Sequence, residues 1–301
     1  MGGSFKPDQD IPDLDEQVII VTGGNSGLGL ETVRQLGKHR PARIYLAARS
    51  QDKAEAAIKQ LRESNLEICP IVFLKLDLSS FSSVKAAAQT FASAESRLDI
   101  LVNNAGIMMT AEGLTEDGYE IQFGTNVMGP VLFTQLLLPI LQRTAKLNPQ
   151  TRVVNVSSAS ERVVPSDVYQ LAELKTDMSN RHTTARYCTS KLANIHCTSA
   201  LAERYEDVKF VSVHPGTVRT NLANNTTGFF LRAFIYASSP FSSSAETGAL
   251  AQIWAAVSPD VKSGEYYAPV AVPSSRSKAS RDRELGEKLW GWIEEELKGH
   301  L

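Results

Sequence analysis

The sequence has few cysteines, no marked excess of charge of either sign and no apolar run long enough to cross a membrane. Its three cysteines are an odd number without the spacing of a metal site, so neither a disulfide framework nor a zinc site is predicted. The 31 basic and 33 acidic residues give a formal net charge of −2, which argues against a nucleic-acid-binding protein. The histidines also lack ligand spacing, so no metal site is expected.

Apolar segments are short throughout the chain. The most apolar window, Val131–Leu141, is interrupted by polar residues and a proline, whereas a membrane-spanning helix needs roughly 20 apolar residues. The segment Met1–Glu16 is polar and lacks the charged head and apolar run of a signal peptide. These features predict a cytoplasmic protein without a transmembrane segment.

Hydrophobic residues make up 43% of the 301 positions, which is enough for one large core. They form β-rich runs that alternate with helical segments, an order typical of parallel βαβ units. Seven strands are predicted, at Gln17–Thr22, Arg43–Ala47, Ile71–Lys75, Ile100–Asn103, Arg152–Ser157, Lys209–His214 and Glu265–Tyr267. Helices are predicted at Gly29–Lys38, Lys53–Ser64, Phe81–Ser93, Gly118–Arg143, Tyr187–Tyr205, Ala245–Val257 and Glu284–Leu297. Strand runs without alternation, such as Ile71–Leu74, are expected where helices cover both faces of a sheet.

This pattern predicts one α/β domain, built on a doubly wound, seven-stranded parallel sheet with helices on both faces. We place an N-terminal extension at residues 1–16 and the domain at residues 17–301. Two irregular segments interrupt the alternation, an insertion at residues 160–184 and a lid at residues 221–244. Irregular segments of this length in a compact fold are usually functional or flexible.

A glycine-rich loop follows the first predicted strand. Residues 22–29 read Thr-Gly-Gly-Asn-Ser-Gly-Leu-Gly and lead directly into an amphipathic helix. Glycines let the backbone approach a pyrophosphate closely, and the free N–H groups at a helix start favour the anion. Such loops are common, but the position between a buried strand and a helix favours a dinucleotide site here.

The end of the second strand bears on the choice between NAD and NADP. An acid at this point would accept a hydrogen bond from the adenosine 2′-hydroxyl of NAD, whereas an arginine would meet the 2′-phosphate of NADP. The sequence reads Ala47-Ala48-Arg49-Ser50, with no acid. NADP is therefore the predicted cofactor; the alternative is that Arg49 only caps a surface loop.

Tyr187 and Lys191 place a phenol and an ammonium four residues apart, which puts both on one face of a helix. A tyrosine with a pKa near 10 needs a nearby positive charge to act as a base at neutral pH, and Lys191 is placed to supply it. Tyr205 and Lys209 have the same spacing, but they straddle the predicted end of the helix and should not share a face. The first pair is therefore the candidate for acid–base chemistry.

Several motifs follow one another in a fixed order along the chain. They are Thr22-Gly23-x-x-x-Gly27-x-Gly29, Asp77-Leu78, Asn103-Asn104-Ala105-Gly106, Asn126, Val156-Ser157-Ser158, Tyr187-x-x-x-Lys191 and Pro215-Gly216-Thr217-Val218. Over residues 18–267 this order resembles the short-chain dehydrogenase/reductases and implies their Rossmann fold. Residues 25–32 and 187–194 look like the branch that contains retinol dehydrogenases and light-dependent protochlorophyllide reductase. The epimerase branch would need a glycine at Ser26 and is set aside.

The resemblance implies a catalytic role for four residues. Tyr187 would exchange a proton with the substrate oxygen, and Ser158 would hydrogen-bond and position that oxygen. Lys191 would bind the nicotinamide ribose and lower the pKa of Tyr187, and Asn126 would hold a helix kink and a water of the proton relay. Because side chains alternate along a strand, only one of Ser157 and Ser158 can serve, and the family pattern favours Ser158.

The resemblance also implies contacts with the dinucleotide. Asp77 would meet the adenine, Asn104 and Ala105 the adenosine ribose region, and Val218 with Thr220 the nicotinamide amide. The full predicted cofactor set is Gly23, Asn25, Ser26, Gly27, Leu28, Gly29, Arg49, Asp77, Leu78, Asn104, Ala105, Gly106, Tyr187, Lys191, Pro215, Gly216, Val218 and Thr220.

The sequence indicates the substrate less directly than it indicates the cofactor. Residues 127–131 lack the histidines frequent in the retinol dehydrogenase branch, and the insertion at residues 160–184 separates Ser158 from Tyr187. The lid contains seven large apolar or aromatic residues, Phe229, Phe230, Leu231, Phe234, Ile235, Tyr236 and Phe241. They favour a lipophilic substrate of terpenoid, polyketide, steroid or fatty type, although they would also suit a lid that simply packs on the core. Such a lid could also touch a membrane or lipid droplet.

These observations predict an NADP(H)-dependent oxidoreductase that transfers hydride between the nicotinamide and a carbonyl or alcohol, with Tyr187 as general acid or base. The resemblance also allows a homo-oligomer. The alternative from a different class is a catalytically silent NADP(H)-binding sensor or scaffold.

Overall fold

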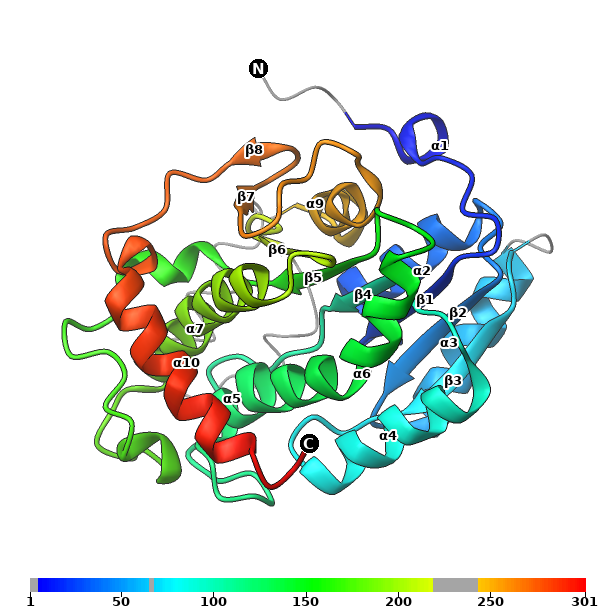
Figure 1. The fold of residues 1–301 in the computed structure, drawn as a ribbon. Coiled ribbons are helices and arrows are strands. Elements are labelled where there is room, and N and C mark those ends of the chain that lie inside the picture. Colours follow the sequence, from blue (N-terminus) through cyan, green and yellow to red (C-terminus); the bar gives the residue numbers. More distant parts are fainter. Residues whose placement is uncertain (1–4, 65–67, 219–242) are drawn as a thin grey trace.

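Among residues 5–64, 68–218 and 243–301, which the computed structural model describes, eight strands form one sheet through the middle of the molecule (Figure 1). The strands are β1 (Val18–Thr22), β2 (Arg43–Ala48), β3 (Ile71–Lys75), β4 (Ile100–Asn103), β5 (Arg152–Val156), β6 (Lys209–Val213), β7 (Tyr266–Ala268) and β8 (Val272–Pro273). Their order across the sheet is β3-β2-β1-β4-β5-β6-β7-β8. Strands β1 to β7 pair in parallel, and β8 pairs antiparallel with β7.

The predicted doubly wound parallel sheet is confirmed, with one strand more than the seven expected. Strand β8 is two residues long and contains Pro273, so it lacks the length and composition by which a strand is recognised in a sequence. The expected burial of Ile71–Leu74 on both faces is wrong, because β3 lies at the edge of the sheet. Val72 there is 36% exposed.

Helices cover both faces of the sheet (Figure 1). One face carries α2 (Gly27–Gly37), α3 (Gln51–Ser64) and α9 (Ala245–Val257). The other face carries α4 (Phe81–Ala94), α6 (Gly129–Ala145) and α7 (Thr183–Arg204), with α10 (Arg283–Leu297) packed on α7. Shorter elements are α1 (Pro7–Asp10), α5 (Ile121–Phe123), and the 3₁₀ turns η2 (Ala159–Val163), η3 (Glu173–Lys175) and η6 (Ala279–Arg281).

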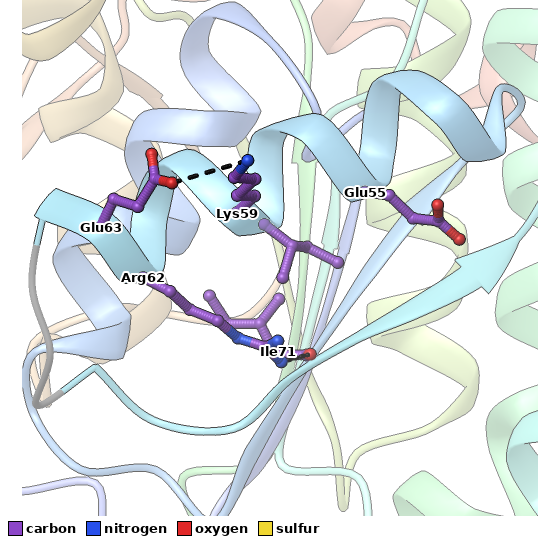
Figure 2. A pocket seen from close by; sticks show the side chains of 6 residues that line it. Glu55, Lys59, Arg62, Glu63 and Ile71 are labelled. Atoms are coloured by element: carbon purple, nitrogen blue, oxygen red, sulfur yellow. Dashed lines mark hydrogen bonds and ion pairs between the residues drawn. The ribbon is translucent and has the colours of Figure 1, made fainter.

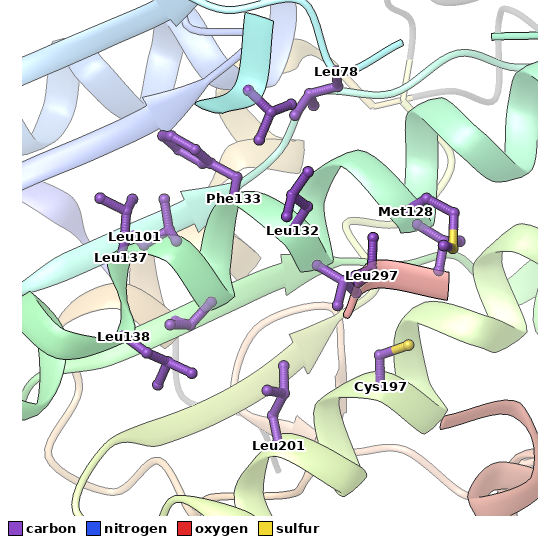
Figure 3. Packing of buried hydrophobic residues seen from close by; sticks show 14 of the residues in the cluster. Leu78, Leu101, Met128, Leu132, Phe133, Leu137, Leu138, Cys197, Leu201 and Leu297 are labelled. Atoms are coloured by element: carbon purple, nitrogen blue, oxygen red, sulfur yellow. The ribbon is translucent and has the colours of Figure 1, made fainter. Parts of the chain in front are cut away.

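Side chains of the central strands alternate between two buried clusters, because successive residues of a strand point to opposite faces. In β1, Ile20 packs in the cluster beneath α4, α6 and α7, whereas Ile19 packs in the cluster beneath α2, α3 and α9. Figure 3 shows part of the first cluster, where Leu132 and Leu137 of α6 and Leu201 of α7 are buried. The sheet is thereby fixed between two apolar layers, and its carboxyl edge is held in one geometry.

The predicted helix Gly118–Arg143 is interrupted near its start. After α5 comes a π-helical segment, η1 (Gly124–Met128), which passes directly into α6. The stretch Ile121–Ala145 is long and apolar enough to cross a membrane by length and composition, but 78% of its most apolar window is buried within the protein. It therefore packs as a core helix of this domain.

The N-terminal residues from Phe5 onward pack on the domain. Ile11 and Leu14 are buried in the cluster beneath α2, α3 and α9. The Leu14 N–H donates to the His39 carbonyl oxygen at 2.9 Å, and Lys38 pairs with Asp8 at 3.2 Å. The predicted extension is thus attached to the body of the domain by both apolar and polar contacts.

The insertion at residues 160–184 is attached to α7 by a buried hydrogen-bonded histidine. The Tyr169 hydroxyl lies 3.0 Å from His196 Nδ1, and His196 Nε2 lies 3.1 Å from the Ala279 carbonyl oxygen. A carbonyl can only accept, so Nε2 carries the proton and Nδ1 accepts from Tyr169. The neutral imidazole thus joins the insertion, α7 and η6.

This histidine predicts a loss of stability in mild acid. Burial lowers the pKa of His196 from 6.5 to about 4. Between those values the unfolded chain binds a proton that the folded chain does not, so the free energy of unfolding falls as the pH falls from about 6.5 to 4. The full difference is on the order of 3 kcal/mol. Urea unfolding of wild type and His196→Gln at pH values across this range measures it.

The matched control for this prediction is His182→Asn. His182 is exposed and caps the first turn of α7, and asparagine can also cap a helix. His196→Gln should flatten the pH dependence of unfolding, whereas His182→Asn should leave it as in wild type. Equal slopes for wild type and His196→Gln would contradict the assignment of acid sensitivity to His196.

Candidate active site

Most of the predicted site residues lie where strands end at the carboxyl edge of the sheet. The glycine loop follows β1, Arg49 follows β2, Asp77 and Leu78 follow β3, and Asn104 to Gly106 follow β4. Ser158 follows β5, and Pro215 to Val218 follow β6. In open parallel sheets ligands bind at this edge. Thr220 and the lid residues 221–242, including its predicted aromatic and apolar residues, lie outside the described residues.

The glycine loop has backbone conformations and contacts that exclude larger residues. Gly23 and Gly27 have φ values of +66° and +54°, in the left-handed region that favours glycine. A Cβ on Gly29 would collide with the Gly23 carbonyl oxygen. Ser26 occupies the N-cap position of α2, but its side chain makes no capping bond to a described residue. The first N–H groups of α2 are therefore available to an anion, as the pyrophosphate of a dinucleotide requires.

The segment after β4 is bonded to the glycine loop. Asn104 Nδ2 donates to the Thr22 carbonyl oxygen at 2.8 Å, and the Ala105 N–H donates to Thr22 Oγ1 at 3.0 Å. A Cβ on Gly23 would lie 3.1 Å from Ala105 Cα, so the two segments are in close contact. The residues predicted to contact the pyrophosphate and the adenosine ribose region are thus brought together, an arrangement that fits a dinucleotide.

Asp77 and Leu78, two other predicted cofactor residues, differ in the exposure of their side chains. Asp77 is half-buried, and its Oδ1 accepts from the N–H and the hydroxyl of Ser79, at 3.0 and 2.7 Å. The Leu78 side chain is buried in the cluster beneath α4 and α6, as Figure 3 shows. Leu78 can therefore offer only its backbone to a ligand.

Tyr187 and Lys191 lie on one face of α7, as their spacing predicts. Both side chains are buried, and the ammonium lies 5.7 Å from the centre of the phenol ring. Lys191 Nζ donates to the Val156 carbonyl oxygen at the end of β5, at 2.9 Å. The rival pair is separated as expected, because Tyr205 ends α7 and Lys209 begins β6.

The two serines after β5 have different partners. Ser157 Oγ donates to the Lys191 carbonyl oxygen at 2.6 Å and so attaches α7 to the segment that follows β5. Ser158 caps η2 by accepting from the Ser160 N–H at 3.2 Å, and its hydroxyl is close enough to the Tyr187 phenol to lower the pKa of that group. The structure therefore brings Ser158, and not Ser157, to the tyrosine.

Burial has the largest effect on the pKa of both groups on α7. It raises the pKa of Tyr187 and lowers the pKa of Lys191 to about 8. The nearby Ser158 hydroxyl opposes the effect of burial and lowers the pKa of the phenol, an effect that the sequence assigned to Lys191. In this environment the phenol holds its proton at neutral pH and is able to act as an acid.

Asn126 lies in the π-helical segment η1 and holds the loop that follows β4. Its Oδ1 accepts from the Ile107 N–H at 2.8 Å, and its Nδ2 donates to the Ile107 carbonyl oxygen at 2.9 Å. Nδ2 also lies 3.0 Å from Ser190 Oγ on α7. One amide thus joins the loop, the helix interruption and the turn of α7 between Tyr187 and Lys191.

Sequence reasoning missed two buried residues that support the site. Gln252 of α9 donates through Nε2 to Thr32 Oγ1 at 2.7 Å and to Asn104 Oδ1 at 3.2 Å. Arg186, directly before Tyr187, forms an ion pair with Glu120 at 3.2 Å, and both side chains are fully buried. No spacing rule connects residues so far apart in sequence, although a charged residue beside a predicted catalytic residue was a visible signal for Arg186.

Comparison with known proteins agrees with this geometry. The family model for short chain dehydrogenase matches residues 17–169. A short-chain dehydrogenase/reductase of Armillaria gallica is 39% identical, over 97% of this chain and 93% of that protein. Human retinol dehydrogenase 12 is 35% identical, over 92% of this chain and 85% of that protein. The solved complex of Pseudomonas aeruginosa RhlG with NADP superimposes with a TM-score of 0.65 at 25% identity, covering 86% of this chain and 96% of that one.

Proposed function

The chain belongs to the short-chain dehydrogenase/reductase family, and from that membership we propose that it is an NADP(H)-dependent oxidoreductase acting on a small lipophilic carbonyl or alcohol. The observation that carries the proposal is the grouping of the buried Tyr187 and Lys191 with the half-buried Ser158, beside a glycine cradle. The retinol dehydrogenase relative and the NADP complex support it.

The chemistry divides between the cofactor and the chain. When bound, the cofactor supplies or accepts the hydride, which carries two electrons to or from the substrate carbon. In the direction of reduction, Tyr187 donates its proton to the substrate oxygen, and in oxidation it takes that proton back. Ser158 accepts from the Ser160 N–H, which leaves its one hydroxyl hydrogen for donation to the substrate oxygen.

Lys191 and Asn126 hold the rest of the site in position. One N–H of the Lys191 ammonium is bound to the Val156 carbonyl oxygen, which leaves two for the ribose hydroxyls next to the nicotinamide. Asn126 fixes the loop after β4 against α7 through Ile107 and Ser190. A site whose donors are fixed before the substrate binds avoids the cost of ordering them during the reaction.

Arg49 is the proposed determinant of the preference for NADP. It is exposed at the end of β2, and the strand end contains no acid that would bind a ribose hydroxyl. Arg49→Ala should weaken NADPH binding about tenfold or more, because a charge-assisted contact with the 2′-phosphate is lost, and should change NADH binding little. Fluorescence titration of both cofactors gives the two dissociation constants. An unchanged ratio of the two constants would contradict the assignment.

The substrate class is proposed from the apolar residues of the lid segment, which lie outside the described residues. A terpenoid, polyketide, steroid or fatty carbonyl or alcohol would suit them. We also propose a cytoplasmic location and allow contact with a membrane or lipid droplet through this segment. Whether the chain forms a homo-oligomer stays a prediction that size-exclusion chromatography with light scattering tests.

A further inference from the structure

A second cation lies beside Arg49 at the carboxyl edge of the sheet. In the parallel pairing of β2 with β3, Ala48 is opposite Lys75, so the residues that end the two strands are neighbours. Lys75 Nζ donates to the Arg49 carbonyl oxygen at 2.5 Å. Both side chains are exposed at this edge. The ammonium is therefore held next to the backbone of the arginine to which the cofactor preference is assigned.

These two cations have no carboxylate partner among the described residues. Asp77, two positions after Lys75, has an oxygen bound to the N–H and hydroxyl of Ser79. Two cations on α3, by contrast, are each bound to another group, as Figure 2 shows beside the surface hollow between α3 and β3. There Lys59 pairs with Glu63 at 3.8 Å, and Arg62 donates to the Ile71 carbonyl oxygen at 3.2 Å. The ends of β2 and β3 thus carry two basic side chains that form no ion pair with a carboxylate in the described part of the chain.

We propose that Lys75 acts with Arg49 to bind the 2′-phosphate of NADP(H), so that two cations set the cofactor preference. This inference rests on the proposed function. A phosphate monoester carries nearly two negative charges, which matches two cations better than one. Arginine suits a bidentate contact with phosphate oxygens, and lysine adds a compact charge with rotatable donors.

The hydrogen bond to the Arg49 carbonyl oxygen holds the Lys75 ammonium beside Arg49, as this role requires. It occupies one N–H of the ammonium and leaves two for phosphate oxygens. It also restrains a side chain that would otherwise lose rotamer freedom when the phosphate binds. Mutual repulsion between the two cations is relieved when a dianion sits between them. NADH has no 2′-phosphate, so neither a phosphate contact nor the relief of this repulsion stabilises its complex.

Dissociation constants of NADPH and NADH for five variants test the proposal. The variants are Lys75→Gln, Lys75→Arg, Arg49→Gln, the double Lys75→Gln/Arg49→Gln and the control Lys59→Gln. Lys75→Gln should weaken NADPH binding about tenfold and leave NADH within about twofold. Lys75→Arg should keep most of the NADPH affinity, and the double variant should bind NADPH more weakly than either single variant. Lys59→Gln removes the same charge from α3 and should change neither constant.

Different outcomes separate this inference from the function on which it rests. Tight NADPH binding by wild type, with Lys75→Gln unchanged or with NADH weakened equally, would overturn the role of Lys75 alone. Failure of wild type to bind either cofactor would overturn the proposed function as well. A second readout is ionic strength, because the loss of a phosphate contact should make the salt dependence of NADPH binding shallower in Lys75→Gln than in wild type. An unchanged salt dependence would also count against the proposal.

Discussion

Tyr187→Phe should lower kcat by about 10²- to 10⁴-fold and leave the dissociation constant of NADPH within about twofold. The substitution removes only the phenolic oxygen, which lies close to Ser158 and is the proton donor of the proposed mechanism. The ring stays buried on α7, and Lys191 keeps its bond to the Val156 carbonyl oxygen. Steady-state turnover and a cofactor titration measure the two quantities separately.

The chain provides a matched control in Tyr205→Phe. Tyr205 also precedes a lysine by four residues, but it ends α7 and its ring packs near Phe210. Its replacement should leave kcat unchanged. Ser158→Ala should lower kcat too, because it removes the hydroxyl that lowers the pKa of the phenol. Full activity in Tyr187→Phe would rule out this residue as the proton donor.

Arg186→Met should lower the free energy of unfolding by about 3–5 kcal/mol, because it leaves Glu120 as a buried carboxylate without its partner. The Arg186 guanidinium also donates to the carbonyl oxygens of Asp177 and Thr110, at 3.3 and 3.4 Å. It therefore connects α7 to the insertion and to the loop after β4. Urea unfolding monitored by circular dichroism measures the loss.

Two further variants show whether burial is the cause. Adding Glu120→Gln to Arg186→Met should restore part of the stability, since the unpaired buried charge is then removed. Arg283→Met breaks an exposed pair with Glu203, in which the arginine side chain is 77% exposed, and should cost less than about 1 kcal/mol. Similar losses in Arg186→Met and Arg283→Met would show that the buried pair contributes no more than a surface pair.

The placement of the candidate catalytic residues could be predicted because their geometry is local. Tyr187 and Lys191 are one helical turn apart, and the glycine loop spans eight consecutive residues, so spacing alone places each group. The context of strand and helix also separated the first tyrosine–lysine pair from Tyr205 and Lys209. The sheet followed for the same reason, because its strands are short segments rich in apolar residues that alternate with helical segments.

Features that depend on long-range contacts could not be predicted. The edge position of β3 follows from the order of the strands, which its apolar residues do not reveal. The resemblance implied a helix kink at Asn126, and the interruption lies at Gly124–Met128, but the contacts of Asn126 with Ile107 and Ser190 join residues distant in sequence. The bond between Gln252 and Asn104 joins residues on α9 and after β4, and only the folded chain brings them together.

The central claim is that this chain transfers hydride between NADPH and a lipophilic carbonyl. The most direct measurement is the consumption of NADPH by wild type in the presence of a panel of apolar ketones and aldehydes, with the alcohol product quantified. We predict that at least one compound is reduced, with one alcohol formed for each NADPH oxidised, and that the reaction is lost in Tyr187→Phe. Tight NADPH binding without oxidation across the panel would contradict the claim and favour a cofactor-binding sensor or scaffold.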